Sequence, residues 1–600
     1  MQERLGPGGA DIAGVLRRLG DLACYRGTLA PAQVYYRRSL AIFQNLAPGS
    51  LDEATTLHGI GALLQRKGDV ESATRYFARA VDALEKQTAR LGGTNDVQSS
   101  FRANYASWYL DLEDTLLAQK QSEQAYQVSE RYRARSFLQM LAERDLLFAQ
   151  DVPSELQRAR KRNAAEYDRV QSQIAALNPA KDKKDIDQLL TRLHDLNIER
   201  EQIAEQIKKT SPRFASLQYP RPLDLAGTRQ VLDPGTVLLS YSVGHEHTVL
   251  FVVQPRGTEP GFSVFTLPVS EKDLQARVEQ FRGLIQQRRH ASNHDLVLQA
   301  GQLYSLLFKP AESLVSGADR LVIVPDGSLQ VLPFGALLRN EQQYLVEWKP
   351  VHTVVSATVY DELRKTRRTL DNKPVDLVAF GDPRIPIGKD EVQGTADAEL
   401  GFASERGFTF GRRPFNRREV EDIAGLYPAR NRLYLGVNAT EEHAKAVGND
   451  VRYIHFATHG LLDERFPLNS AIVLTIPEKL QEGKDNGLLQ AWEIFEQVRL
   501  DADLVTLSAC NTGLGQKLSG EGLIGLTRAF EYAGARSVLA SLWSVDDFRT
   551  MQLMERFYSE LKSGKTKDEA LRQAQISLLR SRSSSSPFYW AAFSLFGDWR

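Results

Sequence analysis

The chain has 600 residues, of which 42% are hydrophobic and 25% are charged, a composition typical of globular proteins with well-filled cores. Its 75 Lys and Arg residues balance 75 Asp and Glu residues, so there is no basic excess and direct nucleic-acid binding is not expected. No apolar run reaches the roughly 18 residues of a membrane span, and no apolar leader opens the chain, which argues against a transmembrane helix and a signal peptide. The two cysteines, Cys24 and Cys510, exclude a disulfide framework, so a reducing, cytoplasmic location is expected.

The N-terminal part of the chain has a helical pattern that repeats. Two units place small residues and one aromatic residue at the same offsets from their first glycine. The first unit has Gly20, Gly27, Ala32, Tyr36 and Ser39, and the second has Gly61, Gly68, Ala73, Phe77 and Ala80. Small residues at these offsets let two antiparallel helices approach closely, while the aromatic side chain fills the groove between them.

This spacing is typical of the tetratricopeptide (TPR) repeat, although the first glycines lie 61 − 20 = 41 residues apart, so an extended turn must join the units. A third, degenerate unit without the glycines is expected around Ala125. Residues 1–145 are therefore predicted to form a TPR-like α-solenoid that offers a concave surface to peptides or partner proteins. Cys24 lies on the apolar face of the first helix and is expected to be a small buried residue.

A charged stretch at residues 146–215 follows the predicted repeats. Between residues 154 and 209, leucine and isoleucine alternate with Lys, Arg, Asp and Glu, and Asn178-Pro179 interrupts the pattern. This pattern predicts a long helical hairpin or linker whose charged side chains are solvated, and it indicates no specific function.

From about residue 216 the pattern changes to strands alternating with helices. Two β-rich runs at 236–241 and 248–253 join through Gly244 as a hairpin, and amphipathic helices are predicted at about 271–288 and 294–308. Short apolar strands are then predicted at 320–324, 352–355, 375–380, 432–435, 453–456, 471–474, 504–507 and 537–541. Buried strands that alternate with helices predict a mostly parallel sheet covered by helices.

Two further segments of this region are not regular. Residues 384–412 are rich in glycine and charge, and are expected to form a mobile loop. Residues 583–586 are four serines, expected to be a surface linker to the aromatic segment 588–593. That segment is too apolar for a free tail and is predicted to dock on the core.

Two of the predicted strands lead into residues that suit a thiol protease. The strand at 453–456 is followed by His459-Gly460, and the strand at 504–507 is followed by Cys510. Parallel strands end at the same edge of a sheet, so His459 and Cys510 are expected to lie together there. A thiol with a pKa of about 8.5 needs an imidazole to activate it and to protonate the leaving group. The backbone N–H groups of Gly460 and Cys510 are candidates for the oxyanion hole.

Other interpretations of these residues stay open at this point. A His-Gly and a Ser-Ala-Cys at strand ends can also be turn residues of an inert fold. His455 alternates with its neighbours along the strand and points into a packed face, so a structural role is expected for it rather than that of the base. His245, His247 and His443 lack carboxylate or cysteine partners at metal-ligand spacing, so neither a metal site nor a cofactor is predicted.

Residues 216–600 resemble the CHAT domain, a caspase-like peptidase domain that follows TPR arrays in bacteria. The resemblance rests on an ordered set of motifs: Val324-Pro325-Asp326-Gly327, Ala379-Phe380-Gly381-Asp382-Pro383, Ala457-Thr458-His459-Gly460, Ser508-Ala509-Cys510-Asn511-Thr512-Gly513, Gly520-Glu521-Gly522, Ser541-Leu542-Trp543-Ser544-Val545-Asp546-Asp547 and Tyr589-Trp590-Ala591-Ala592-Phe593. It implies an α/β/α sandwich in which residues 216–380 form a pseudo-caspase-like half and residues 381–600 form the catalytic half.

The resemblance also implies site roles: His459 as the base and Cys510 as the nucleophile, in the clan that holds caspases, separase and gingipains. The caspase signature Gln-Ala-Cys-x-Gly is not met, because Ser508 precedes Ala509, so specificity for aspartate is not implied. In separase-like relatives a matching acidic residue receives a basic P1 side chain, which makes Asp547, with Asp546 beside it, the candidate for the S1 pocket. The alternative is that Asp546 caps a helix and Asp547 is a charge in its first turn.

These features together predict a TPR-CHAT cysteine endopeptidase that cleaves a protein substrate. The repeats are expected to bind a protein or ribonucleoprotein partner, or the substrate, and partner binding is expected to gate the site. The resemblance adds a role in prokaryotic defence or stress signalling, without membrane contact. The alternative is a non-catalytic TPR scaffold with a degenerate caspase-like domain, and acyl transfer by the same two residues is a third interpretation.

Overall fold

The computed structural model describes residues 10–46, 50–88, 105–133, 222–287, 293–340, 342–365, 373–385, 413–462, 470–477, 485–511, 521–543 and 545–600, with scattered positions between 155 and 206. At residues 509–511 and 521–524 it describes the backbone alone. The chain divides into two compact units, one of Met1–Gln121 with Arg135–Pro222 and one of Ser122–Ala134 with Leu223–Arg600. Most of the expected mobile loop, residues 386–412, lies outside the described residues.

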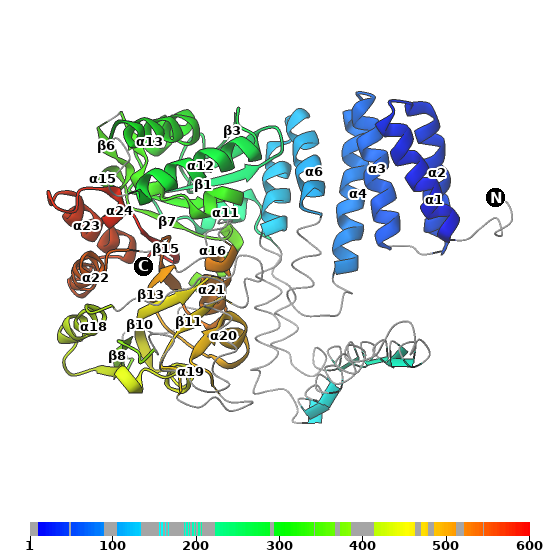
Figure 1. Cartoon of the computed structure of the whole chain (residues 1–600). Coiled ribbons are helices and arrows are strands. Elements are labelled where there is room, and N and C mark those ends of the chain that lie inside the picture. The colour runs from blue at the N-terminus through cyan, green and yellow to red at the C-terminus, as the bar shows by residue number, and fades with distance from the viewer. Residues whose placement is uncertain are drawn as a thin grey trace. The chain divides into compact units, whose positions relative to one another are not determined.

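The first unit contains helical hairpins. Its helices are α1 (Ala10–Tyr25), α2 (Leu29–Leu46), α3 (Leu51–Arg66), α4 (Val70–Thr88) and α6 (Ala106–Ala118) (Figure 1). The turns from α1 to α2 and from α3 to α4 use Gly27 at φ +76° and Gly68 at φ +81°, a left-handed conformation that favours glycine. The few described residues of the charged stretch support a hairpin, because Arg192 pairs with Glu166 at 2.7 Å.

The small residues of the repeat pattern allow the close helix approach that the sequence predicts. A Cβ atom on Gly20 would lie 2.7 Å from the Tyr36 ring, and one on Gly61 would lie 2.7 Å from the Phe77 ring. Both rings are buried, with Tyr36 3% exposed and Phe77 fully buried. The predicted TPR-like packing is therefore confirmed for the first two units. Cys24 is buried in α1, as expected.

We expect Gly61→Ala to loosen the α3–α4 hairpin, because the added methyl group would overlap the Phe77 ring and overpacking costs about 1–3 kcal/mol. Gly14→Ala in α1 is the matched control, since no atom lies within 4 Å of its added Cβ. There alanine should stabilise the helix by about 0.5–1 kcal/mol. Amide hydrogen exchange of the full chain measures both effects. Unchanged exchange of the α3 and α4 amides in Gly61→Ala would contradict the packing argument.

The second unit is built on one sheet of thirteen strands in the described part of the chain. The order is β12-β11-β10-β13-β14-β15-β7-β4-β1-β2-β3, and β8 pairs with β10 and with β9. The strands are β1 (Thr236–Val243), β2 (Thr248–Val253), β3 (Phe262–Leu267), β4 (Arg320–Val324), β7 (Val351–Thr353), β8 (Val375–Gly381), β9 (Asn431–Leu435), β10 (Val451–Leu461), β11 (Ala471–Val473), β12 (Leu488–Gln490), β13 (Leu504–Asn511), β14 (Ser537–Ser541) and β15 (Phe593–Gly597). A separate two-stranded sheet joins β5 (Leu338–Arg339) and β6 (Gln343–Tyr344).

The central strand pairs of this sheet are mostly parallel, as predicted. The pairs β9–β8–β10–β13–β14 and β1–β4–β7 run parallel, whereas β1–β2–β3, β10–β11–β12 and β14–β15 run antiparallel. Each predicted strand has a counterpart in the structure. The sequence does not predict β3, β12 and β15. β3 and β12 join the sheet by antiparallel pairing, and β15 pairs antiparallel on one side and parallel on the other.

Helices cover both faces of the sheet (Figure 1). They are α11 (Leu225–Val231), α12 (Glu271–Gln286), α13 (Asn293–Leu307), α14 (Glu312–Val315), α15 (Leu345–Trp348), α16 (Ala357–Lys365), α18 (Asn416–Gly425), α19 (Glu441–Lys445), α20 (Ala491–Gln497), α21 (Glu521–Ala533), α22 (Asp547–Lys562), α23 (Lys567–Leu579) and α24 (Pro587–Trp590). Figure 1 shows β10 and β13 between α18 and α22 on one side and α20 and α21 on the other. Among the described helices, none combines the length and apolarity that crossing a membrane requires.

The C-terminal segment joins the two halves of the sheet. β15 pairs antiparallel with β14 and parallel with β7, at Phe596 and Thr353. The aromatic segment before and into it is buried, with Trp590 fully buried and Phe593 2% exposed, so the predicted docking on the core is confirmed. The prediction that the four serines form a surface linker is wrong for Ser584. Its side chain is fully buried and donates a hydrogen bond of 2.9 Å to the Leu578 carbonyl oxygen.

A helix at residues 122–133 belongs to the same compact unit as the sheet. The buried Glu130 carboxylate accepts hydrogen bonds from the backbone N–H groups of Ala357 and Thr358, both 3.2 Å, at the start of α16. Burial raises the pKa of Glu130 above its ordinary value. Arg133 donates to the Ser240 hydroxyl at 2.8 Å. These buried contacts of charged side chains attach the helix to α16 and to β1.

Candidate active site

The backbone of two neighbouring strands brings His459 and Cys510 together. β10 and β13 pair in parallel with His459 opposite Cys510, Thr458 opposite Ala509 and Gly460 opposite Asn511. Both strands therefore end at one edge of the sheet, and the predicted juxtaposition is confirmed for the backbone of the two residues. The strands are longer than predicted, since β10 continues to Leu461 and β13 to Asn511, so the two residues lie within the last part of each strand and not beyond it.

A third neighbour of β10, the strand β11, pairs with its last residues and so lengthens it. β11 pairs antiparallel with the end of β10, with His459 opposite Val473 and Gly460 opposite Ile472. His459 is consequently only 8% exposed. Gly460 and Cys510 lie in paired backbone at the end of the ladder, and their role as oxyanion donors stays a prediction.

His455 has the structural role that the sequence predicts. It is fully buried, and its Nε2 lies 2.8 Å from Glu419 Oε1 on α18. Its Nδ1 lies 3.3 Å from the hydroxyl of Tyr558 on α22, which in turn lies 2.9 Å from the Thr506 hydroxyl. Because both ring nitrogens of His455 have partners, the ring links β10 to two helices and is not poised to act as a base.

A strand's side chains alternate between its two faces, so His459 lies on the same face of β10 as His455, four residues earlier. That face is the one covered by α18 and α22, because Glu419 and Tyr558 come from those helices. The N-terminus of α22 carries Asp546 and Asp547, the two residues predicted for the S1 pocket.

The structure separates the roles of these two aspartates. Asp546 is the N-cap of α22 and accepts a hydrogen bond of 3.1 Å from the Arg549 backbone N–H. This is the capping role that the sequence offers as the alternative to a place in the S1 pocket. Asp547 accepts a hydrogen bond of 3.0 Å from the Phe415 N–H through Oδ2. Burial raises the pKa of the Asp547 carboxyl above its usual range, although the Arg413 charge and the Phe415 N–H oppose that rise. Whether Asp547 binds substrate stays a prediction.

Arg413 is a site residue that the sequence did not indicate. Its side chain is 8% exposed, its Nε lies 3.3 Å from Asp547 Oδ1, and its Nη1 donates to the Thr458 carbonyl oxygen at 2.8 Å. It therefore bridges the start of α22 and the residue before His459. A basic residue at the end of a stretch rich in glycine and charge carries no sequence pattern that predicts such a contact.

The described residues contain one group of carboxylates with metal-ligand spacing, Glu441, Asp485 and Glu493. Lys445 Nζ lies 2.5 Å from Glu441 Oε1, 2.8 Å from Asp485 Oδ1 and 2.8 Å from Glu493 Oε1. The ammonium group thus takes the position that a cation would need. Burial raises the pKa of Glu441 to about 7, and the neighbouring Glu493 adds to the rise.

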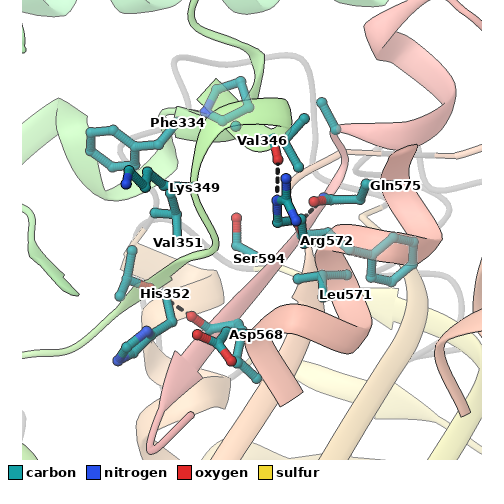
Figure 2. Close-up of a pocket in the computed structure, with 16 residues that line it drawn as sticks. Phe334, Val346, Lys349, Val351, His352, Asp568, Leu571, Arg572, Gln575 and Ser594 are labelled. Carbon is teal, nitrogen blue, oxygen red and sulfur yellow. Dashed lines mark hydrogen bonds between the residues drawn. The ribbon is translucent and has the colours of Figure 1, made fainter. Parts of the chain in front are cut away.

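Figure 2 shows a cavity whose lining comes from elements other than β10, β13 and α22. Three of the lining side chains donate to backbone oxygens: Arg572 to Glu347 at 2.7 Å, Lys349 to Ser316 at 3.0 Å and Gln575 to Phe593 at 3.0 Å. The bonds of Arg572 and Gln575 connect α23 to α15 and to β15, which gives these two side chains a structural role.

Two regions of the chain match known domain families. A family model of the CHAT domain matches residues 298–598. The chain belongs to the CHAT domain family. A tetratricopeptide repeat model matches residues 11–86, so TPR repeats precede the CHAT domain in this chain.

Curated relatives of this CHAT protein are also repeat proteins. Tetratricopeptide repeat protein 28 of Mus musculus is 27% identical over 343 residues, which are 49% of this chain and 13% of the relative. The Homo sapiens protein of the same name is 28% identical over 346 residues, again 49% of this chain and 13% of the relative. The matched region thus spans about an eighth of the relatives' length.

Solved structures that are similar to this chain include a separase–securin complex and a gingipain. The separase–securin complex of Saccharomyces cerevisiae has a TM-score of 0.36 and 10% identity, covering 98% of this chain and 49% of the other. The Arg-specific cysteine proteinase gingipain R has a TM-score of 0.31 and 11% identity, covering 52% of this chain and 68% of the other.

Proposed function

We propose that this CHAT protein is a cysteine endopeptidase, with Cys510 as nucleophile and His459 as the base. The observation that supports the proposal is the parallel register that sets His459 opposite Cys510. Neighbouring strands lie about 4.8 Å apart, so this register brings an imidazole-bearing and a thiol-bearing residue within reach of each other. The test is cleavage of a protein substrate by the full chain, which Cys510→Ala is expected to abolish.

The proposed reaction uses the two side chains in sequence. The Cys510 thiol gives its proton to His459, and the thiolate attacks the scissile carbonyl carbon. The imidazolium then protonates the amine that leaves, and a water molecule, deprotonated by the same imidazole, hydrolyses the thioester. Backbone N–H groups at Gly460 and Cys510 would stabilise the negative oxygen of each tetrahedral intermediate. Because this chemistry needs a reduced thiol, the proposal includes a reducing, cytoplasmic site of action.

For the substrate we propose a basic P1 residue. A partly buried carboxylate at the start of α22, linked through Arg413 to the backbone of β10, suits a guanidinium or ammonium group. Asp547 is the residue proposed for this contact, and Asp546 is proposed only to support it through the helix cap.

The TPR repeats are proposed to bind a protein or ribonucleoprotein partner that gates cleavage. TPR repeats bind peptides and proteins on their concave surface, and a protease that acts among cellular proteins needs restraint. We expect the partner to raise the cleavage rate at least tenfold by shifting the site toward its competent state. The measurement compares cleavage by the full chain with and without co-purified partners. Equal rates with every candidate partner would contradict gating.

A further inference from the structure

The candidate S1 carboxylate already holds a guanidinium group from the same chain. Arg413 Nε lies 3.3 Å from Asp547 Oδ1, and the side chain is 8% exposed. Its Nη1 donates to the Thr458 carbonyl oxygen at 2.8 Å. Arg413 precedes α18 in the chain and belongs to none of β10, β13 and α22.

The Arg413 guanidinium contacts the residue next to one of the candidate catalytic residues. Thr458 directly precedes His459 in β10, and its register partner, Ala509, directly precedes Cys510 in β13. A carboxylate and a backbone carbonyl oxygen are together the acceptors that a planar guanidinium fork needs. A substrate arginine that bound Asp547 would therefore compete with Arg413 for the same acceptors.

We propose that Arg413 occupies the P1 subsite as an internal ligand, so that the chain as described is self-inhibited toward substrates with a basic P1 residue. The identification of the subsite rests on the proposed function. A basic substrate residue binds only after Arg413 leaves Asp547, and this displacement is the step that an activating partner accelerates.

The segment that carries Arg413 has other attachments. The Phe415 N–H donates to Asp547 Oδ2 at 3.0 Å, and the Phe415 ring contacts the Phe548 ring at a centroid distance of 5.2 Å. Removal of the Arg413 side chain therefore leaves the start of α18 anchored on α22. If the ion pair between Arg413 and Asp547 is purely structural, its removal lowers the stability of the protein and does not increase its affinity for a guanidinium ligand. If Arg413 is an internal ligand, its removal increases that affinity.

The binding experiment uses the full chain with Cys510→Ala, so that no cleavage interferes, and agmatine as the guanidinium probe. Titration calorimetry should show that adding Arg413→Ala tightens agmatine binding at least tenfold, and that adding Asp547→Asn as well removes this gain. The matched control is Arg417→Ala, an α18 arginine that is 48% exposed and pairs with Asp382 at 2.9 Å. It should leave agmatine binding unchanged.

Two results would overturn the inference: no gain in Arg413→Ala, or a gain that persists with Asp547→Asn. If circular dichroism shows that Arg413→Ala is unfolded, Arg413→Gln replaces it, because glutamine keeps a donor for the Thr458 carbonyl oxygen without the charge. The same gain, or its absence, then decides the question.

An activity experiment with Cys510 intact separates this inference from the proposed function. Arg413→Ala should raise the ratio of kcat/KM for peptides with P1 Arg to kcat/KM for peptides with P1 Leu at least tenfold. Tighter agmatine binding without any cleavage would reject the protease proposal and keep the internal ligand. Cleavage of P1 Arg peptides without any gain from Arg413→Ala would keep the protease and reject the internal ligand.

Discussion

Cys510→Ala is expected to lower the rate of substrate cleavage by this CHAT protein by a factor of about 10³ or more. The nucleophile forms the covalent bond to the substrate, and its loss leaves only the small contribution of binding and oxyanion stabilisation. His459→Ala should cost about as much, because a thiol without its base has neither activation nor a proton for the leaving group. The double variant should be no slower than either single variant, since residues that act as a unit are not additive.

Cys24→Ala is the matched control for this experiment. Cys24 is the other cysteine of the chain and is buried in α1, so its replacement should leave cleavage unchanged. Cleavage products are measured by mass spectrometry of a proteome exposed to each full-length variant. The same products with Cys510→Ala as with the unaltered chain would favour the alternative, a TPR scaffold whose CHAT domain is not catalytic.

Asp547→Asn is expected to lower kcat/KM for peptides with P1 Arg by about 10–100-fold, because a hydrogen bond to a charged group contributes about 1.5–3 kcal/mol. Peptides with P1 Leu should be cut at an unchanged rate. Since burial raises the pKa of Asp547, acid should mimic the substitution. The preference for P1 Arg should fall as the pH drops through that pKa, which lies above the ordinary aspartate value of about 3.9.

Asp546→Asn is the control for the Asp547 experiment. Asparagine caps helices as well as aspartate does, so the N-cap hydrogen bond to Arg549 should survive and P1 preference should not change. Measurement of kcat/KM for matched P1 Arg, P1 Leu and P1 Asp peptides tests both variants. If P1 Asp peptides are cut and P1 Arg peptides are not, Asp547 does not form a basic S1 pocket.

The central strands and the TPR hairpins could be predicted because their signals are local. The packing of one hairpin can be predicted from three residues, such as Gly20, Gly27 and Tyr36. The first glycine lies seven residues before the turn glycine, and the aromatic residue lies nine residues after it. Apolar runs between helices likewise show buried parallel strands such as β10 and β13. The cap Asp546 could be found in the same way, since it accepts a hydrogen bond from the backbone N–H three residues on.

Three features could not be predicted, because each depends on segments far apart in the chain. β15 joins β14 to β7, and strand pairing of this kind is set by register between distant segments. Glu419 partners His455 across 36 residues, and Arg413 reaches Asp547 from an unrelated segment. A single charged residue outside a periodic pattern gives no signal of such a contact.

The sequence by itself determined the class of this protein: TPR repeats, a mostly parallel sheet, and a histidine and a cysteine near the ends of two strands. Those properties follow from side-chain periodicity and turn residues, which act over a few positions. Only the tertiary structure decided that His459 and Cys510 are register partners and that Arg413 binds Asp547. These follow from the register of non-local strands and from burial, which brings charges from separate segments together where water cannot satisfy them.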